Sequence, residues 1–294
     1  MKTKTLLCLL PLLTTFVPVV VRAQSGPLIR YDFASVTGDL IEDVSGNNRS
    51  GSLIGTGVQG ADKTGVSGQT GDRAFNNTAS TMGYNTVPTG GGGVSAPSLG
   101  NLSSFTVTLW FKTDGKQPLK NSARLFDASN RFVLAGLASG RVALTYNLGS
   151  GNSGTLIDVT DTTTLANQDP SWVFIALTYD GTSTTGLDNV KIYAGSASES
   201  VKLIGSNSSV SITGIQNLPT LYFGVNGPAG GRAFDGWLDD IRVYGNASTG
   251  AGALSIEALD AVRLQSIPES AMTALFAGGA GLFALVAWRY RAEK

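Results

Sequence analysis

Histidine is absent from the 294-residue sequence, and Cys8 is its single cysteine. This composition excludes Ser-His-Asp and Cys-His catalysis, histidine-ligated zinc and acid–base chemistry by imidazole. Charged residues are also scarce, at 14% of the chain, against roughly 25% in an average soluble protein. Because 21 basic residues balance 21 acidic ones, no attraction to polyanions is expected, and nucleic acid is excluded as a partner.

Glycine, in contrast, is abundant, with 38 residues. Together with many Ser and Thr residues, it indicates tight turns and short strands rather than helical bundles. The glycine run at 89–94 is the strongest candidate for a linker, but a strand pattern resumes soon after it. We therefore expect a long surface loop there and a single domain over residues 24–266.

Alternation of apolar and polar residues predicts the strands. Residues 104–112 place four apolar side chains on one face, so we expect one face in the core and the other open to solvent. Residues 172–179 are apolar on both faces, which is typical of a central strand. Short runs of this kind, broken by turn residues, predict an all-β, two-sheet sandwich. One helix is expected near 254–264, with Ser255 as its N-cap.

Residues 1–23 have the layout of a secretory signal peptide, in which two lysines precede a largely apolar run that ends near the small residue Ala23. We expect cleavage between Ala23 and Gln24. An N-terminal membrane anchor is the alternative, but Pro11 and Pro18 interrupt the apolar run. After cleavage no cysteine remains, so the mature chain can form no disulfide.

The C-terminal region contains a second apolar segment, residues 271–288, which carries no charge. As a helix it would be roughly 27 Å long, enough to cross the hydrocarbon core of a membrane. Arg289 and Arg291 follow it. By the positive-inside rule they predict a cytoplasmic C-terminus and a domain on the far side of the membrane.

Pro268-Glu269-Ser270, the apolar segment and the arginine-rich tip follow one another in residues 267–294. This order resembles the PEP-CTERM sorting tail of Gram-negative bacteria. The resemblance implies an exosortase-like membrane protease as a partner, inner-membrane retention, cleavage near Pro268-Glu269, and release to the cell surface or extracellular matrix. Ser270 stands where that family usually has a second proline. A simple single-pass anchor is the alternative.

A series of motifs in residues 26–264 resembles the LamG-like jelly roll of the concanavalin A-like lectin and glucanase group. The motifs are Tyr31-Asp32-Phe33 and residues 43–48, 105–111, 172–181, 189–193 and 234–244. The resemblance implies a two-sheet antiparallel jelly-roll sandwich and a role in glycan or matrix binding. A sandwich of another lineage is the alternative.

Asp239 lies in the predicted strand 238–244, on the same face as Ile241 and Val243. If these two face the core, Asp239 is drawn inward, where an ionised carboxylate needs a cation or several N–H donors. Calcium takes oxygen ligands and requires neither His nor Cys. The resemblance to the LamG-like jelly roll implies a calcium ligand here, because the equivalent aspartate in proteins of that fold often holds a structural calcium ion. We therefore predict Asp239 as a ligand of one structural calcium ion, with plain hydrogen bonding as the alternative.

Asp43, in the loop 43–48, is a second candidate metal ligand with the same alternative. Asp240 and Arg242 share the opposite strand face from Asp239, and we expect them to form a solvated ion pair.

Glucanases of the resembling fold carry their carboxylates as Glu-x-Asp-x-Glu along one strand, and this pattern does not occur in the sequence. Glutamate appears in residues 24–266 only as Glu42, Glu199 and Glu257. We therefore predict a non-enzymatic, exported module that binds extracellular polysaccharide or surface glycans. A purely structural matrix protein and a hydrolase or lyase are the alternatives. Four aromatic residues could stack on sugars or pack in the core: Trp110, Tyr146, Tyr222 and Trp237.

Overall fold

The computed structural model describes residues 26–77, 91–113, 122–136, 142–149, 153–159 and 171–267. Several predictions lie outside these ranges: the signal peptide with its cleavage point at Ala23 and Gln24, the sorting residues Pro268, Glu269, Ser270, Arg289 and Arg291, and the apolar segment 271–288. Within the described ranges, no helix has the length and apolar character needed to cross a membrane.

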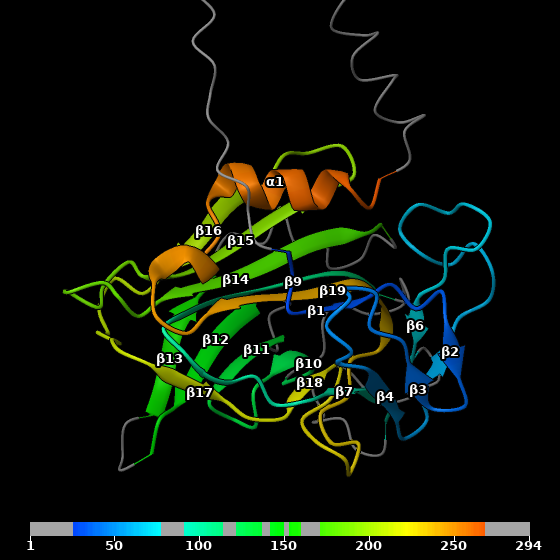
Figure 1. The fold of residues 1–294 in the computed structure, drawn as a ribbon, viewed down its shortest axis with the longest axis horizontal. Coiled ribbons are helices and arrows are strands. Elements are labelled where there is room, and N and C mark those ends of the chain that lie inside the picture. The colour runs from blue at the N-terminus through cyan, green and yellow to red at the C-terminus, as the bar shows by residue number, and fades with distance from the viewer. Residues whose placement is uncertain are drawn as a thin grey trace, which may run out of the picture.

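Two antiparallel sheets pack face to face (Figure 1). The first sheet has the order β16 (Lys202–Ser206), β15 (Val190–Ser196), β14 (Val173–Asp180), β9 (Ser104–Thr113), β19 (Gly236–Asn246), β6 (Phe75–Asn76) and β5 (Val58–Gln59), and β1 (Ile29–Tyr31) also pairs with β19. The predicted all-β antiparallel sandwich is confirmed.

The second sheet completes the sandwich. Its order is β13 (Ser153–Asp158), β12 (Val142–Asn147), β11 (Phe132–Gly136), β10 (Arg124–Asp127), β18 (Leu221–Phe223), β7 (Gly93–Ala96), β4 (Gly51–Ile54), β3 (Leu40–Ile41) and β2 (Val36–Thr37). A separate ribbon pairs β8 (Gly100–Leu102) with β17 (Gln216–Leu218).

The main core lies between the two sheets. Phe105 of β9 contacts Phe132 of β11 and Tyr179 of β14, with ring centroids 5.4 and 5.3 Å apart. β14 lies between β9 and β15 and is buried along nearly its whole length, as its apolar pattern predicts. The inward side chains of both sheets thus exclude water from one continuous interior.

A second layer covers the other face of the first sheet. The 3₁₀ turn η1 (Gly250–Gly252) and the helix α1 (Ile256–Leu264) follow β19, and α1 lies across this sheet in Figure 1. Apolar residues of the sheet and of this covering layer pack together and form what we call the outer cluster, which contains Trp110, Phe174, Ala176, Tyr193, Val201, Tyr244, Leu254, Leu259, Val262 and Ile267. The prediction that one face of β9 is open to solvent is therefore wrong, because the chain returns to cover that face.

Ser255 caps α1 as predicted, since its side chain accepts a hydrogen bond from the backbone N–H of Ala258. Leu259 and Val262, at i and i+3, face the sheet and are buried.

The glycine run is buried where it is described. Gly91, Gly92 and Gly93 are all buried, and Gly93 begins β7. A Cβ on Gly92 would lie 1.9 Å from the backbone nitrogen of Gly57. The expectation of a surface loop is thus wrong for residues 91–93, because these glycines allow two backbone segments to approach each other closely.

Candidate functional site

The candidate site is centred on a β-bulge in β19. Asp239 pairs with Trp110 and Arg242 pairs with Thr108, so two residues of β19 lie opposite one residue of β9. Asp240 takes a φ of 40° within this bulge. The bulge interrupts the alternation of side chains and gathers several charged groups on the outer side of the first sheet.

Asp239 is buried, with 2% of its surface exposed, but it does not share a face with Ile241 and Val243 as predicted. Those two residues belong to the main core, whereas Asp239 pairs with Trp110 of the outer cluster. The bulge is the physical reason for this correction. The carboxylate of Asp239 accepts hydrogen bonds from the backbone N–H groups of Val66, at 2.8 Å, and of Asp240, at 2.7 Å.

Asp240 and Arg242 form a buried ion pair, so the prediction of a solvated pair is wrong. Asp240 is 5% exposed and Arg242 2% exposed. Nη2 of Arg242 lies 2.6 Å from Oδ2 of Asp240, and Nε of Arg30 lies 3.0 Å from Oδ1. The bulge and the segment after α1 cover the pair. We call Arg30, Asp240 and Arg242 the ionic cluster.

The segment that follows α1 is tied to this cluster. Gln265 accepts a hydrogen bond from Nη1 of Arg242, and Ser266 donates one from its hydroxyl to Asp240. The cluster therefore joins β1, β19 and the end of the helix in one network.

The ionisable groups of β19 have shifted pKa values. Burial raises the pKa of Asp239 well above its ordinary value, and the charges of Asp72 and Asp240 raise it further. Burial also acts to raise the pKa of Asp240, but the charge and hydrogen bonds of Arg242 outweigh it and lower the pKa. The raised pKa of Tyr244 has burial as its main cause, so its hydroxyl stays protonated.

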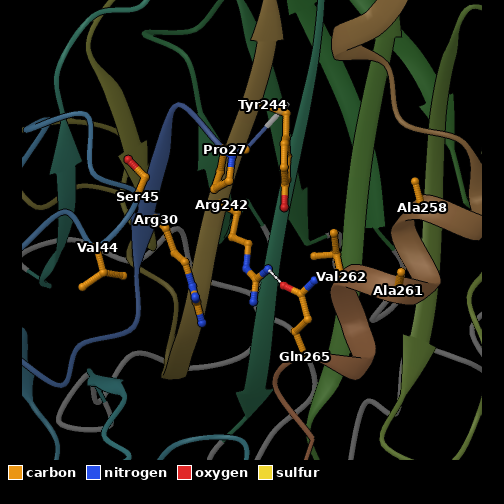
Figure 2. Close-up of a pocket in the computed structure, with 11 residues that line it drawn as sticks. Pro27, Arg30, Val44, Ser45, Arg242, Tyr244, Ala258, Ala261, Val262 and Gln265 are labelled. Atoms are coloured by element: carbon orange, nitrogen blue, oxygen red, sulfur yellow. Dashed lines mark hydrogen bonds between the residues drawn. The ribbon is translucent and has the colours of Figure 1, made fainter. Parts of the chain in front are cut away.

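Two cavities open on either side of the ionic cluster. The arginine cavity, of about 260 Å³, lies between β1, β19 and α1, and Pro27, Arg30, Ser45, Arg242, Tyr244 and Ala261 line it. Figure 2 shows the side chains of Arg30 and Arg242 side by side within it. The acidic cavity, of about 290 Å³, is lined by Arg30, Asp32, Asp72, Asp239, Asp240 and Ser266.

Asp43 is buried and holds the loop that follows β3. Its Oδ1 accepts hydrogen bonds from the backbone N–H groups of Arg30 and Ser45, both at 3.0 Å, and its Oδ2 accepts one from Arg49 at 2.8 Å. Although burial acts to raise its pKa, these hydrogen bonds lower it. The carboxylate is saturated by N–H donors, which fits the hydrogen-bonding alternative rather than a metal ligand.

Asp239 fits a calcium ligand better than Asp43. Its buried charge lies close to those of Asp72 and Asp240, and a cation in the acidic cavity would offset this repulsion. No three acidic, His or Cys side chains in the described ranges are grouped as a metal site, so backbone or water oxygens would have to supply other ligands.

Of the four aromatic residues considered for stacking on sugars, two are buried and two are partly exposed. Trp110 is buried in the outer cluster and Tyr146 in the main core, so neither can contact a ligand. Tyr222 and Trp237 are partly exposed. The Nζ of Lys112 lies 4.6 Å from the ring centroid of Trp237, which occupies one face of this indole. Glu42 and Glu199 are exposed in loops, Glu257 is exposed on α1, and none of them lines either cavity.

Arg30 and Tyr244 line the arginine cavity, and the sequence analysis did not single them out as candidate site residues. Arg30 lies between Ile29 and Tyr31, both fully buried. This alternation places Arg30 on the outer face of β1 and could have indicated a charged group there. Its partner Asp240 lies 210 positions further along the chain, and no local pattern could have paired them.

A two-sheet jelly roll with a helix over one sheet and polar cavities at its edge defines a lectin-like sandwich. The chain belongs to the concanavalin A-like lectin/glucanases superfamily, whose laminin G-like family profile matches residues 88–252. No curated protein matches the sequence.

Solved structures share this fold at low sequence identity. Domain 4 of AbnA, an extracellular arabinanase from Geobacillus stearothermophilus, solved in complex with arabinotriose, is 18% identical with a TM-score of 0.51; the match covers 81% of this chain and 98% of that domain. The binding domain of botulinum neurotoxin DC, solved with rat synaptotagmin II, is 14% identical with a TM-score of 0.52, over 81% of this chain and 51% of the toxin chain.

A third structure is botulinum neurotoxin type C, whose cell entry depends on two ganglioside molecules. It is 15% identical with a TM-score of 0.52, and the match covers 81% of this chain and 50% of the toxin chain. This chain thus spans about half the length of the toxin chains.

Proposed function

We propose that the protein is a non-catalytic carbohydrate-binding module that is exported to the cell surface or extracellular matrix. The arginine cavity carries the proposal, because it combines hydrogen-bonding groups with an apolar wall in a domain of a lectin superfamily. The arabinotriose complex of a domain with the same fold adds support.

The test is a binding screen of the purified domain against a panel of neutral and acidic polysaccharides, read by affinity electrophoresis and calorimetry. We expect saturable binding to at least one polymer and no release of reducing ends. A domain that binds none of them would favour the alternative of a purely structural matrix protein. Cleavage of a bound polymer would favour the hydrolase or lyase alternative.

The absence of catalysis is part of the proposal. A glycosidase needs two carboxyl groups roughly 5 to 10 Å apart, facing one cleft. Asp240 of the acidic cavity is neutralised by Arg30 and Arg242, and Asp72 accepts hydrogen bonds from the backbone N–H and hydroxyl of Ser67 at 2.7 and 2.6 Å. Neither carboxylate is free to act as an acid or a nucleophile.

We further propose that one structural calcium ion binds in the acidic cavity, with Asp239 as its carboxylate ligand. The raised pKa of Asp239 means that the folded protein holds a proton there more tightly than the unfolded chain does. The resulting stability is complete below the unfolded pKa of 3.8 and is lost as the pH rises through the folded pKa. A calcium ion would take the place of this proton at neutral pH.

We expect a chelator to lower the melting temperature, and to lower it more at about pH 8 than at about pH 5, because Asp239 is then more fully ionised. Calcium should restore the higher value. The lowered pKa values of Asp43 and Asp240 have the opposite effect on stability, because their stabilisation is lost as the pH falls. That loss occurs only below about pH 3.8, outside the range of this comparison. Equal melting temperatures in chelator and calcium, with no metal found by elemental analysis, would contradict the calcium site.

Export and sorting form the last part of the proposal and rest on residues 1–23 and 267–294. Mass spectrometry of the mature chain from secreted and membrane fractions tests both. We expect an N-terminus at Gln24 and, in the secreted fraction, a C-terminus near Pro268-Glu269. An intact C-terminal segment in every fraction would favour the single-pass anchor over processing by an exosortase-like protease.

A further inference from the structure

We propose that the arginine cavity binds the carboxylate of a uronic acid residue, so that the glycan ligand of the protein is an acidic polysaccharide. This inference rests on the proposed glycan-binding function and specifies its ligand class. The ligand-facing group is Arg30, and Arg242 and Tyr244 support it.

The guanidinium of Arg30 lines the cavity and has N–H groups available for a ligand. Its side chain is 34% exposed, and its hydrogen bond to the ionic cluster uses Nε alone. The two Nη groups have no hydrogen bond to any residue in the described ranges and form the planar fork that matches a carboxylate. In Figure 2 this guanidinium lies beside that of Arg242, between β1 and the helix.

Tyr244 supplies a hydroxyl on the same wall. Burial raises the pKa of Tyr244, so its hydroxyl stays protonated and can donate a hydrogen bond to a ligand oxygen. Ser45 places a second hydroxyl at the cavity rim. Both hydroxyls suit the oxygen-rich edge of a sugar ring.

The charge of the cavity indicates a singly charged anion. Arg30 and Arg242 carry two positive charges, and Asp240 offsets one of them. The remaining single positive charge matches a carboxylate better than a doubly charged phosphate. A buried guanidinium at Arg242 also keeps this positive charge fixed, because Asp240 raises its pKa further.

The shape of the cavity indicates one sugar residue of a polymer. Its volume of about 260 Å³ lies just below the usual range for drug-sized ligands. Ala258 and Ala261 of α1 give it an apolar side on which a pyranose face can lie. The cavity lies at the surface between β1 and the helix, so a chain could continue from the bound residue in either direction.

The test compares oligogalacturonate with its fully methyl-esterified form by calorimetry. Both have the same sugar backbone, and only the first has free carboxylates. We expect the wild-type protein to bind the acid form and Arg30→Gln to weaken that binding about tenfold or more, the loss expected for a charged hydrogen bond. Arg49→Gln, which removes the same charge from the neighbouring loop outside both cavities, should leave affinity unchanged.

A second pair of variants keeps the ionic cluster intact. Ala261 is exposed on the helix and lines the cavity. Ala261→Glu places a negative charge there and should abolish binding of the acid form, whereas Ala261→Gln, of nearly equal size, should retain more affinity. Both variants should melt like the wild type.

The outcomes separate this inference from the proposed function. Equal binding of acid and ester forms, or an acid-form affinity that Arg30→Gln and Ala261→Glu leave unchanged, overturns the inference while glycan binding stands. Preference for a sulfated polymer that contains no uronic acid over the uronate overturns the carboxylate assignment. If the protein binds neither acidic nor neutral polysaccharide, both the inference and the proposed function are overturned.

Discussion

Asp240→Asn is expected to lower the free energy of unfolding by about 3–5 kcal/mol, the cost of leaving one member of a buried ion pair without its partner. Arg242 is 2% exposed and cannot turn to solvent, so its charge would stay buried without a carboxylate to neutralise it. Urea denaturation followed by tryptophan fluorescence measures the change.

The pH dependence of the stability lost in Asp240→Asn shows whether the loss comes from the charge of Asp240. Asp240 has a pKa below its ordinary value of 3.8 in the folded protein. Its contribution to stability is therefore present above 3.8 and is lost as the pH falls through the folded pKa. The difference in the free energy of unfolding between wild type and Asp240→Asn should become smaller in that acid range. A difference that does not depend on pH would indicate altered packing instead.

Two controls complete this experiment. Glu199→Gln breaks the ion pair with Lys202, in which both side chains are more than half exposed, and should change stability by less than about 1 kcal/mol. The double variant Asp240→Leu with Arg242→Met replaces the buried pair by apolar groups and should recover much of the lost stability. If it is as unstable as Asp240→Asn, the uncompensated charge is not the cause.

Trp110→Ala is expected to lower the free energy of unfolding by about 3–5 kcal/mol, because it removes the largest side chain of the outer cluster. Trp110 is fully buried, and its ring meets Phe174 edge to face with centroids 5.4 Å apart. The cavity left behind would lie between the first sheet and α1. Chemical denaturation monitors stability, and hydrogen exchange of α1 should show faster opening of the helix than of β14.

Trp110→Phe provides the matched control. It keeps an aromatic ring in place and removes the indole N–H, a buried donor without a partner in the described structure. Its cost should be clearly smaller than that of Trp110→Ala. Trp237→Ala, on the same sheet but partly exposed, should also cost less, and equal losses for all three variants would contradict the role of the outer cluster.

Much of the fold follows from local patterns. The apolar alternation of residues 104–112 and the two-sided apolar run 172–179 predict β9 and β14, and Ser255 predicts the start of α1. These features are readable because strand and helix periodicities and capping depend on residues close together in the chain. Coverage of the outer face of β9 depends on a helix far along the chain and is not visible locally.

The site was less predictable than the fold. Asp239 is buried as predicted, but on the opposite face from Ile241 and Val243, because its face depends on the bulge, which exists only in the pairing of β19 with β9. Alternation carried across Asp240 therefore assigns side chains to the wrong face. The roles of Asp43 and Arg30 depend on the backbone conformation of a loop and on a partner from the other end of the domain.

The two ends of the described domain lie at one place. Gly26 and Pro27 line the same cavity as Gln265, and the backbone N–H of Leu28 bonds to Val243 of β19. A pulling force applied between the ends would therefore act first on β1, β19 and the ionic cluster, and the second sheet lies outside the path of that force.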